Sequence, residues 1–273
     1  MKIVFWGTPI YAIPSLNLLF NSDHEIICVI TQPDKRRGRG NKLIPSPIKE
    51  IADRQSIPVI TPERITNNKE FLCQLKNINA DIYIVVAFGQ ILPKEVLDIP
   101  KFGCWNSHAS LLPKWRGAAP IQWSLMNGDK QTGVGIMSME ETLDTGPIIT
   151  QRVLEIEPMD NYFTLSEKLS LLSAELLLET VETINSKQNN KKDDNIPQLK
   201  LISQSELSNE ETSYARMIKK EDYKINWKTN SIDINRKVNA LYPNAYSLIN
   251  TKRLKITKTK VITSSDIDRY KDN

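Results

Sequence analysis

The chain has 273 residues, 40% of them hydrophobic and 25% charged, with a formal net charge of +4, which fits one large globular domain or two. Its apolar runs have the length of strands and are too short to cross a bilayer, and the N-terminus lacks the pattern of a secretory signal. Three widely spaced cysteines, Cys28, Cys73 and Cys104, do not form a disulfide framework, so we expect a cytoplasmic protein with reduced thiols and no membrane contact.

Strand-like and helix-like segments alternate through the first part of the chain. The strand-like runs are 2–6, 25–31, 57–61, 81–88, 101–108, 132–140 and 147–156. The helix-like segments include an amphipathic run that ends near Phe20, then 46–55, 118–128 and 164–186. Ser46 is the expected N-cap of one helix, Gly128 the expected end of another, and Thr164 with Glu167 has capping-box spacing. Continuous apolar strands between helices predict an α/β fold with a Rossmann-like, mostly parallel sheet covered on both faces.

The pattern changes after residue 186. Residues 187–198 are polar and charged without apolar periodicity, which predicts a linker between a first domain at 1–186 and a second at 199–273. Segments 224–230 and 244–263 alternate short strand-like pieces with turns. The second domain is therefore expected to be small and β-rich.

Two basic clusters stand on a chain that is otherwise net acidic. Residues 34–42 hold five basic residues and one acid, and residues 214–260 hold twelve basic residues and three acids. Either cluster alone is equally well explained as a solvated basic face. Two clusters together favour a polyanionic partner, of which RNA and DNA are the obvious class.

One of only two histidines stands at the end of a predicted strand, in the stretch 104–122. Asn106 and His108 are two residues apart, so their side chains share one side of the strand, at the edge of an open sheet where ligands bind. Asp144 follows in a turn between two later strands, where it could also serve only to accept local backbone N–H groups. An amide, an imidazole and a carboxylate can together polarise a carbonyl, stabilise an oxyanion and handle an amine proton. The alternative is a histidine that merely packs at a strand end.

Other chemistries fit less well. The first strand is followed by a lone Gly-Thr-Pro, with neither the three-glycine dinucleotide fingerprint nor a Walker lysine. The histidines and cysteines are too few and too scattered for zinc, so no metal is expected, and no serine-hydrolase elbow is present. Cys104 paired with His108 is a conceivable nucleophile, but Cys104 precedes the strand end and is expected to point into the core.

The stretch "NSHASLLPKWRGAAPIQ" (106–122), followed by "LDTGP" (143–147), resembles the folate-dependent formyltransferases. Within that family, "SLLPKWRGAAPIQ" is most similar to the members whose acceptor is methionyl initiator tRNA. Four further motifs match in order, so that the resemblance covers nearly the whole chain: "FWGTP" and the segments 31–49, 85–97 and 214–227. It implies the formyltransferase fold with an OB-like C-terminal domain that binds tRNA. It also implies 10-formyltetrahydrofolate as co-substrate, with no tightly bound cofactor. We expect the chain to act as a monomer.

The resemblance also implies roles for individual residues. Asn106 and His108 would bind the formyl oxygen and stabilise the oxyanion, and Asp144 would orient His108 or a water and help remove the amine proton. Since an α-amino group titrates near ~8 and an ester lowers that value, most of the catalysis is expected from positioning and oxyanion stabilisation. The implied folate-binding residues are Ser110, Leu111, Leu112 and Pro113, with Phe88, Gly89, Ile91 and Leu92. The implied tRNA contacts are Arg36, Arg37, Arg39 and Lys42, in a loop that Gly38 and Gly40 allow to move.

Family members usually continue past the point where this sequence stops, so the C-terminal barrel is expected to be incomplete or shortened. Two alternatives remain open. The first is formyl transfer to another amine, on an amino-sugar nucleotide or glycinamide ribonucleotide, against which the basic loop and "WRGAAPI" argue. The second is a tRNA-binding relative without activity, against which the intact Asn106, His108 and Asp144 set argues.

Overall fold

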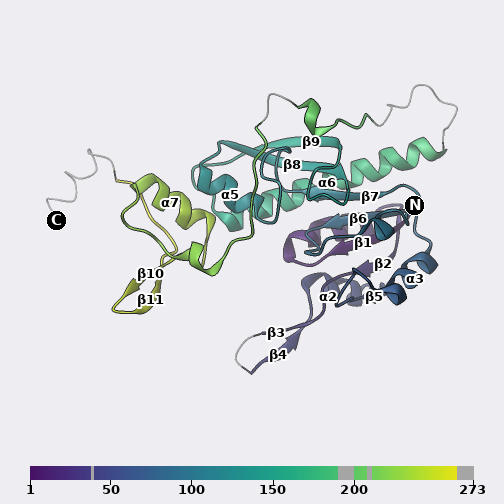
Figure 1. The fold of residues 1–273 in the computed structure, drawn as a ribbon, viewed down its shortest axis with the longest axis horizontal. Helices are drawn as coiled ribbons and strands as arrows, with labels where there is room; N and C mark the ends of the chain where they lie inside the picture. Colours follow the sequence, from purple (N-terminus) through teal and green to yellow (C-terminus); the bar gives the residue numbers. More distant parts are fainter. Residues whose placement is uncertain (38–39, 190–199, 208–210, 263–273) are drawn as a thin grey trace.

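A seven-stranded sheet forms the centre of the first domain (Figure 1). The structure is a computed structural model that describes residues 1–37, 40–189, 200–207 and 211–262. The strands, in their order across the sheet, are β5 (Val59–Ile60), β2 (Glu25–Ile30), β1 (Lys2–Gly7), β6 (Ile82–Val86), β7 (Cys104–His108), β8 (Gln131–Ser138) and β9 (Ile148–Glu155). The first five run parallel, whereas β8 and β9 are antiparallel to their neighbours. The expected mostly parallel sheet is confirmed, and its strand order reverses between β1 and β6.

Helices cover both faces of this sheet, because the buried runs 3–6 of β1 and 82–86 of β6 are apolar on both faces. In β1, Ile3 and Phe5 point into one core and Val4 and Trp6 into the other. The first core lies under η1 (Ile10–Ala12), α1 (Ile13–Phe20), α2 (Pro47–Arg54), α5 (Pro120–Asn127) and α6 (Tyr162–Asn189). The second core lies under α3 (Lys69–Ile78) and α4 (Lys94–Leu97).

The helix ends follow local chemistry, with one correction. The Ser46 hydroxyl accepts the Lys49 backbone N–H at 3.0 Å, and Gly128 ends α5 in the left-handed conformation, as predicted. The capping box predicted at Thr164 and Glu167 is wrong, because α6 begins two residues earlier. Asn161 is its cap: the Asn161 side chain accepts the Thr164 N–H, and the Thr164 hydroxyl accepts the Asn161 N–H.

The C-terminal domain is small and contains strands, as expected. Its hairpin pairs β10 (Tyr246–Ile249) with β11 (Lys252–Lys255), and a short η3 (Lys220–Tyr223) precedes it. Helix α7 (Ser231–Ala240) was not predicted, and 224–230 forms no strand beyond a bridge between Lys224 and Tyr246. The missed signals were an asparagine cap and the apolar residues Ile234 and Val238, one helical turn apart.

Only the first residues of the predicted linker 187–198 are described by the structure, and they are helical. Residues 187–189 continue α6, and 190–198 lie outside the described residues. Beyond them the chain returns along the first domain as two pieces, 200–207 and 211–216, which we call the return segment. Ile202 bridges Ile148 of β9, and Tyr214 bridges Arg116. The short η2 (Gln204–Glu206) lies in its first piece.

Candidate active site

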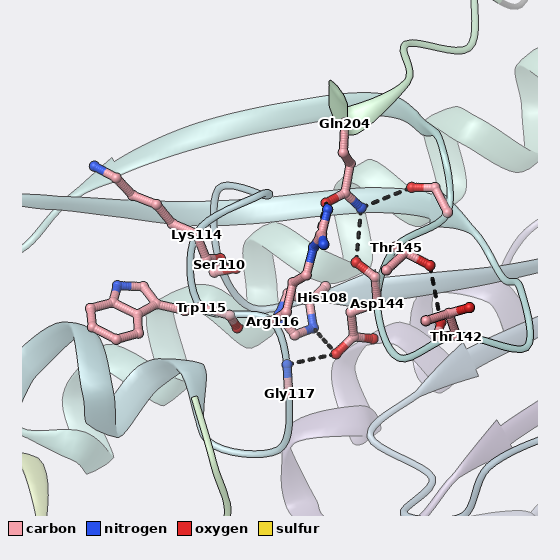
Figure 2. A network of polar contacts seen from close by, with 11 residues as sticks. His108, Ser110, Lys114, Trp115, Arg116, Gly117, Thr142, Asp144, Thr145 and Gln204 are labelled. Atoms are coloured by element: carbon pink, nitrogen blue, oxygen red, sulfur yellow. Dashed lines mark hydrogen bonds and ion pairs between the residues drawn. The ribbon is translucent and has the colours of Figure 1, made fainter. Parts of the chain in front are cut away.

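The structure brings His108 and Asp144 together. His108 is the last residue of β7, and Asp144 lies in the loop between β8 and β9. His108 Nδ1 and Asp144 Oδ2 are 3.7 Å apart, and the two side chains are only 7% and 12% exposed (Figure 2). Burial strengthens the electrostatic attraction between a carboxylate and a protonated imidazole.

Asn106 lies two residues earlier on the same strand. It pairs with Val85 of β6 and Met137 of β8, which fixes its backbone within the sheet. Its half-buried side chain makes no hydrogen bond to another residue of the described chain. The amide is therefore available to a ligand on the side of the strand that His108 occupies.

The second ring nitrogen of His108 has its own partner. Nε2 lies 2.9 Å from the Trp115 carbonyl oxygen, which can only accept, so Nε2 carries a proton and donates it. Nδ1 then faces Asp144, as a lone pair in the neutral ring and as a second N–H in the imidazolium. The pair can thus take up a proton at Nδ1 and stabilise the resulting charge with Asp144.

Asp144 is held by its side chain and by its backbone. Oδ2 accepts the backbone N–H of Gly117 at 2.8 Å, and Asp144 itself adopts a left-handed φ of 52°. Gly117 has a φ of 119°, and a Cβ there would lie 2.7 Å from the Ala215 carbonyl oxygen, so the position requires glycine. The buried Gln204 donates its amide to the carbonyl oxygens of Asp144 and Gly146, each at 2.9 Å.

Sequence reasoning missed Gly117 and Gln204. Gly117 stands in "RGAAP", directly before α5, which is a visible turn signal. Gln204 carries no signal, because it is one polar residue in a polar stretch far along the chain from its partners. Its importance comes only from the fold.

The eight residues implied to bind folate follow two neighbouring strands. Ser110, Leu111, Leu112 and Pro113 follow β7, and the segment 88–92 follows β6. Ser110 is fully buried and donates its hydroxyl to the Lys114 carbonyl at 2.6 Å, and the Leu112–Pro113 peptide bond is cis. Phe88, Leu92 and Leu112 are buried in core clusters. These three side chains are therefore closed to a ligand, whereas Ile91 is exposed and Leu111 is half-buried.

The implied tRNA loop is a hairpin of β3 (Lys35–Arg37) and β4 (Lys42–Ile44) that projects away from the sheet (Figure 1). Arg36 and Lys42 are exposed on its two strands. Arg37 belongs to β3, whereas Gly38 and Arg39 lie outside the described residues. An ion pair of 2.9 Å between Asp34 and Lys49 ties the base of the hairpin to α2.

The rival chemistries gain no support from the geometry. Cys104 is buried and donates to the Leu97 carbonyl, and burial raises the pKa of its thiol, which disfavours the nucleophilic thiolate. Within 1–37, 40–189, 200–207 and 211–262, no three His, Cys, Asp or Glu residues gather as a metal site. Across the same described chain, no helix is long and apolar enough to span a membrane.

Comparison with known proteins shows which family the chain belongs to. The formyl transferase family profile matches residues 1–181, and its C-terminal domain profile matches residues 217–269. A curated methionyl-tRNA formyltransferase of Prochlorococcus marinus (strain MIT 9215) is 55% identical over 271 residues, which are 99% of this chain and 81% of that protein.

Solved structures with low sequence identity share the fold. A 4-N formyltransferase from Francisella tularensis is 19% identical with a TM-score of 0.68, over 96% of this chain and 98% of that one. A sugar 3N-formyl transferase, crystallised in the presence of dTDP and 5-N-formyl-THF, is 23% identical with a TM-score of 0.64, over 93% of this chain and 85% of that one. The chain belongs to the formyl transferase family, and within it groups with the methionyl-tRNA formyltransferases.

Proposed function

We propose that this enzyme transfers the formyl group of 10-formyltetrahydrofolate to the α-amino group of methionyl initiator tRNA and so supports translation initiation. The observation that carries the proposal is the His108–Asp144 pair beside the Asn106 amide, which has no hydrogen-bond partner among the described residues, in a chain 55% identical to a methionyl-tRNA formyltransferase. The alternatives, transfer to another amine and an inactive tRNA-binding relative, are not favoured by that similarity.

The donor is proposed from the folate chemistry of the family. A structural relative was crystallised with a formylated tetrahydrofolate. In this chain the strand order reverses between β1 and β6, and ligands of open α/β sheets bind beyond the carboxyl ends of strands at such a point. Segment 88–92 follows β6 there, with Ile91 exposed and the Phe88 carbonyl held by the Thr8 hydroxyl at 2.9 Å. We assign the pterin to this segment and the formyl-bearing end to the 110–113 turn beside His108.

The reaction requires one bond to form and one to break. The neutral amine attacks the formyl carbon, the carbonyl oxygen becomes an oxyanion, and the bond from that carbon to the folate nitrogen then breaks. The Asn106 amide donates to the oxyanion, and one such donor is typically worth about 10²–10³ in rate. The amine proton passes to the His108–Asp144 pair, directly or through a water, and from there to the leaving folate nitrogen.

The acceptor is bound through exposed cations. Arg36 and Lys42 stand on the β3–β4 hairpin, and Lys252, Arg253 and Lys255 are exposed on the β10–β11 hairpin. Arg253 stacks over the Tyr246 ring at 4.4 Å, which holds its guanidinium at the surface. Such cations neutralise phosphates, and with Arg37 and Arg39 we assign the first hairpin to the tRNA acceptor end. The enzyme is proposed to act as a monomer, because one chain supplies the whole site, and in the cytoplasm, where charged tRNA is used.

The test is formyl transfer from 10-formyltetrahydrofolate to methionine-charged initiator tRNA by this 273-residue chain, with uncharged tRNA as the blank. Parallel reactions offer glycinamide ribonucleotide and an amino-sugar nucleotide. Saturable transfer to the charged tRNA alone is expected. Preferred transfer to either small amine would refute the acceptor assignment, and no transfer to any amine would favour the inactive relative.

A further inference from the structure

Both the oxygen and the nitrogen of the Gln204 side-chain amide make hydrogen bonds to residues around the candidate active site. Its oxygen accepts from Arg116 Nε at 2.9 Å and from Arg116 Nη2 at 2.6 Å, and its nitrogen donates to the carbonyl oxygens of Asp144 and Gly146 (Figure 2). The orientation of the amide follows from chemistry, because a guanidinium can only donate and a carbonyl can only accept. Gln204 is 5% exposed, so each of these hydrogen bonds is costly to lose.

The contacts of Gln204 complete a hydrogen-bond network around His108 and Asp144. Three consecutive residues take part: the Trp115 carbonyl accepts from His108, the Arg116 side chain binds Gln204, and the Gly117 N–H binds the Asp144 carboxylate. Gln204 also holds the Asp144 backbone. Asp144 is thus fixed at its carboxylate through Gly117 and at its main chain through Gln204, and His108 is fixed through Trp115.

The return segment, which follows the predicted linker in the chain, contributes further hydrogen bonds to this network. Besides Gln204, the Ser213 hydroxyl accepts the Trp115 N–H at 3.0 Å, and the Ala215 N–H donates to the Arg116 carbonyl at 2.7 Å. Residues 115–117 are therefore held on one side by the return segment and hold the catalytic pair on the other. None of these contacts involves the His108 ring or the Asp144 carboxylate.

We infer that Gln204 is a positioning residue, which sets the geometry of His108 and Asp144 from the far side of the linker and makes formyl transfer depend on the docking of the return segment. The inference rests on the proposed function for its kinetic consequence. A displacement of about 1 Å in a catalytic group can cost about 10²-fold in rate. Loss of Gln204 should therefore lower kcat with little change in KM, because the residue contacts neither proposed substrate.

Two variants separate the two halves of the amide. Gln204→Glu keeps an acceptor for Arg116 but puts a carboxylate oxygen against the carbonyls of Asp144 and Gly146, whereas Gln204→Met removes both halves at similar volume. Both should lower kcat by about 10- to 100-fold, with KM for the folate and for the tRNA within about threefold of wild type. The control is Glu206→Gln, an exposed change in the same short helix, which should leave kcat unchanged.

A spectroscopic readout reports the geometry without turnover. The chain has only two histidines, so ¹⁵N-histidine NMR shows two imidazoles, which His24→Gln assigns. In the wild type, the His108 shifts should report a proton on Nε2. In Gln204→Glu and Gln204→Met those shifts should move while the His24 shifts stay, and Glu206→Gln should move neither. If Gln204→Met does not fold, Gln204→Glu carries the test. Arg116→Lys then serves as a further variant, because it removes the two hydrogen bonds that the guanidinium donates to the Gln204 oxygen.

The outcomes separate this inference from the proposed function. Wild-type kcat in both Gln204 variants, or lowered kcat with unmoved His108 shifts, would overturn the positioning role. If the wild type transfers formyl to no amine, the proposed function fails. The NMR comparison then still decides whether Gln204 sets the His108–Asp144 geometry.

Discussion

The loops of the candidate active site and the two basic hairpins are built in opposite ways. In the loops 108–117 and 140–147, buried side chains and backbone groups are tied to one another and to the return segment. The hairpins β3–β4 and β10–β11 are held by their own ladders, and they expose Arg36, Lys42, Lys252, Arg253 and Lys255. The difference fits the two tasks proposed for these regions. Chemistry needs atoms fixed to fractions of an ångström, whereas attraction of a polyanion needs charge density and tolerates variable geometry.

The largest expected effect is on kcat, from a substitution in the tightly held loop 140–147. Asp144→Asn keeps the size of the side chain and an oxygen for Gly117, but removes the charge that faces His108. We expect kcat to fall by about 10²–10⁴-fold, the usual value of general acid–base catalysis, with the fold intact by circular dichroism. Glu141→Gln, an exposed change in the same loop, is the control and should be silent. A fully active Asp144→Asn would place the chemistry elsewhere.

The next effect tests whether close backbone packing around the site matters beyond stability. Gly117→Ala puts a Cβ against the Ala215 carbonyl and disturbs the N–H that holds Asp144, so kcat should fall about 10- to 100-fold. Gly103→Ala is the matched control, since Gly103 also has a positive φ but its Cβ would meet nothing closer than 4.0 Å. That control should lose about 1–2 kcal/mol of stability to backbone strain but keep its kcat. Equal kinetic losses in both variants would contradict the comparison.

A smaller effect is expected on the hairpin. The double variant Arg36→Ala with Lys42→Ala removes two exposed cations and should raise KM for charged tRNA several-fold without changing kcat or KM for the folate. The salt dependence of kcat/KM for tRNA should weaken by about one logarithmic slope unit for each phosphate that the variant no longer neutralises. Lys76→Ala removes an exposed cation from α3 and serves as the control. A change in kcat alone would mean that the hairpin acts on the chemistry.

The smallest effect lies where the return segment meets the C-terminal domain. Hydrogen bonds from the Arg216 guanidinium hold the pKa of Asp222 at about 2, below its ordinary 3.8. A lowered folded-state pKa stabilises the fold above pH 3.8, and this contribution disappears as the pH falls towards 2. Because the pair lies at the surface, Asp222→Asn should lower Tm by only about 2 °C or less at pH 7. Thermal melts at pH 7 and pH 3 should show this difference shrink at the lower pH, and a growing difference would reverse the assigned sign.

The same contrast explains what the sequence could predict. The strand β1, the Ser46 cap and the Gly128 helix end are local, and each was predicted from a few neighbouring residues. The pairing of His108 with Asp144 was anticipated because strand ends in an open sheet converge and a family resemblance supported it. Gln204 joins partners 58, 60 and 88 positions away through one amide, and no periodicity or composition marks such an interaction. Helix α7 was missed because its polar and basic residues obscured a short apolar stripe.

The packing of α7 on α5 joins the C-terminal domain to the apolar core of the first domain. Val238, Leu241 and Ala245 of the C-terminal domain belong to the same apolar core as Ile3 and Phe5 of the central sheet. Apolar burial that crosses a domain boundary couples the unfolding of both sides, so a single thermal transition is expected in place of two. Substitutions in the C-terminal domain are then expected to change how long the first domain stays folded, even where they leave its own residues untouched.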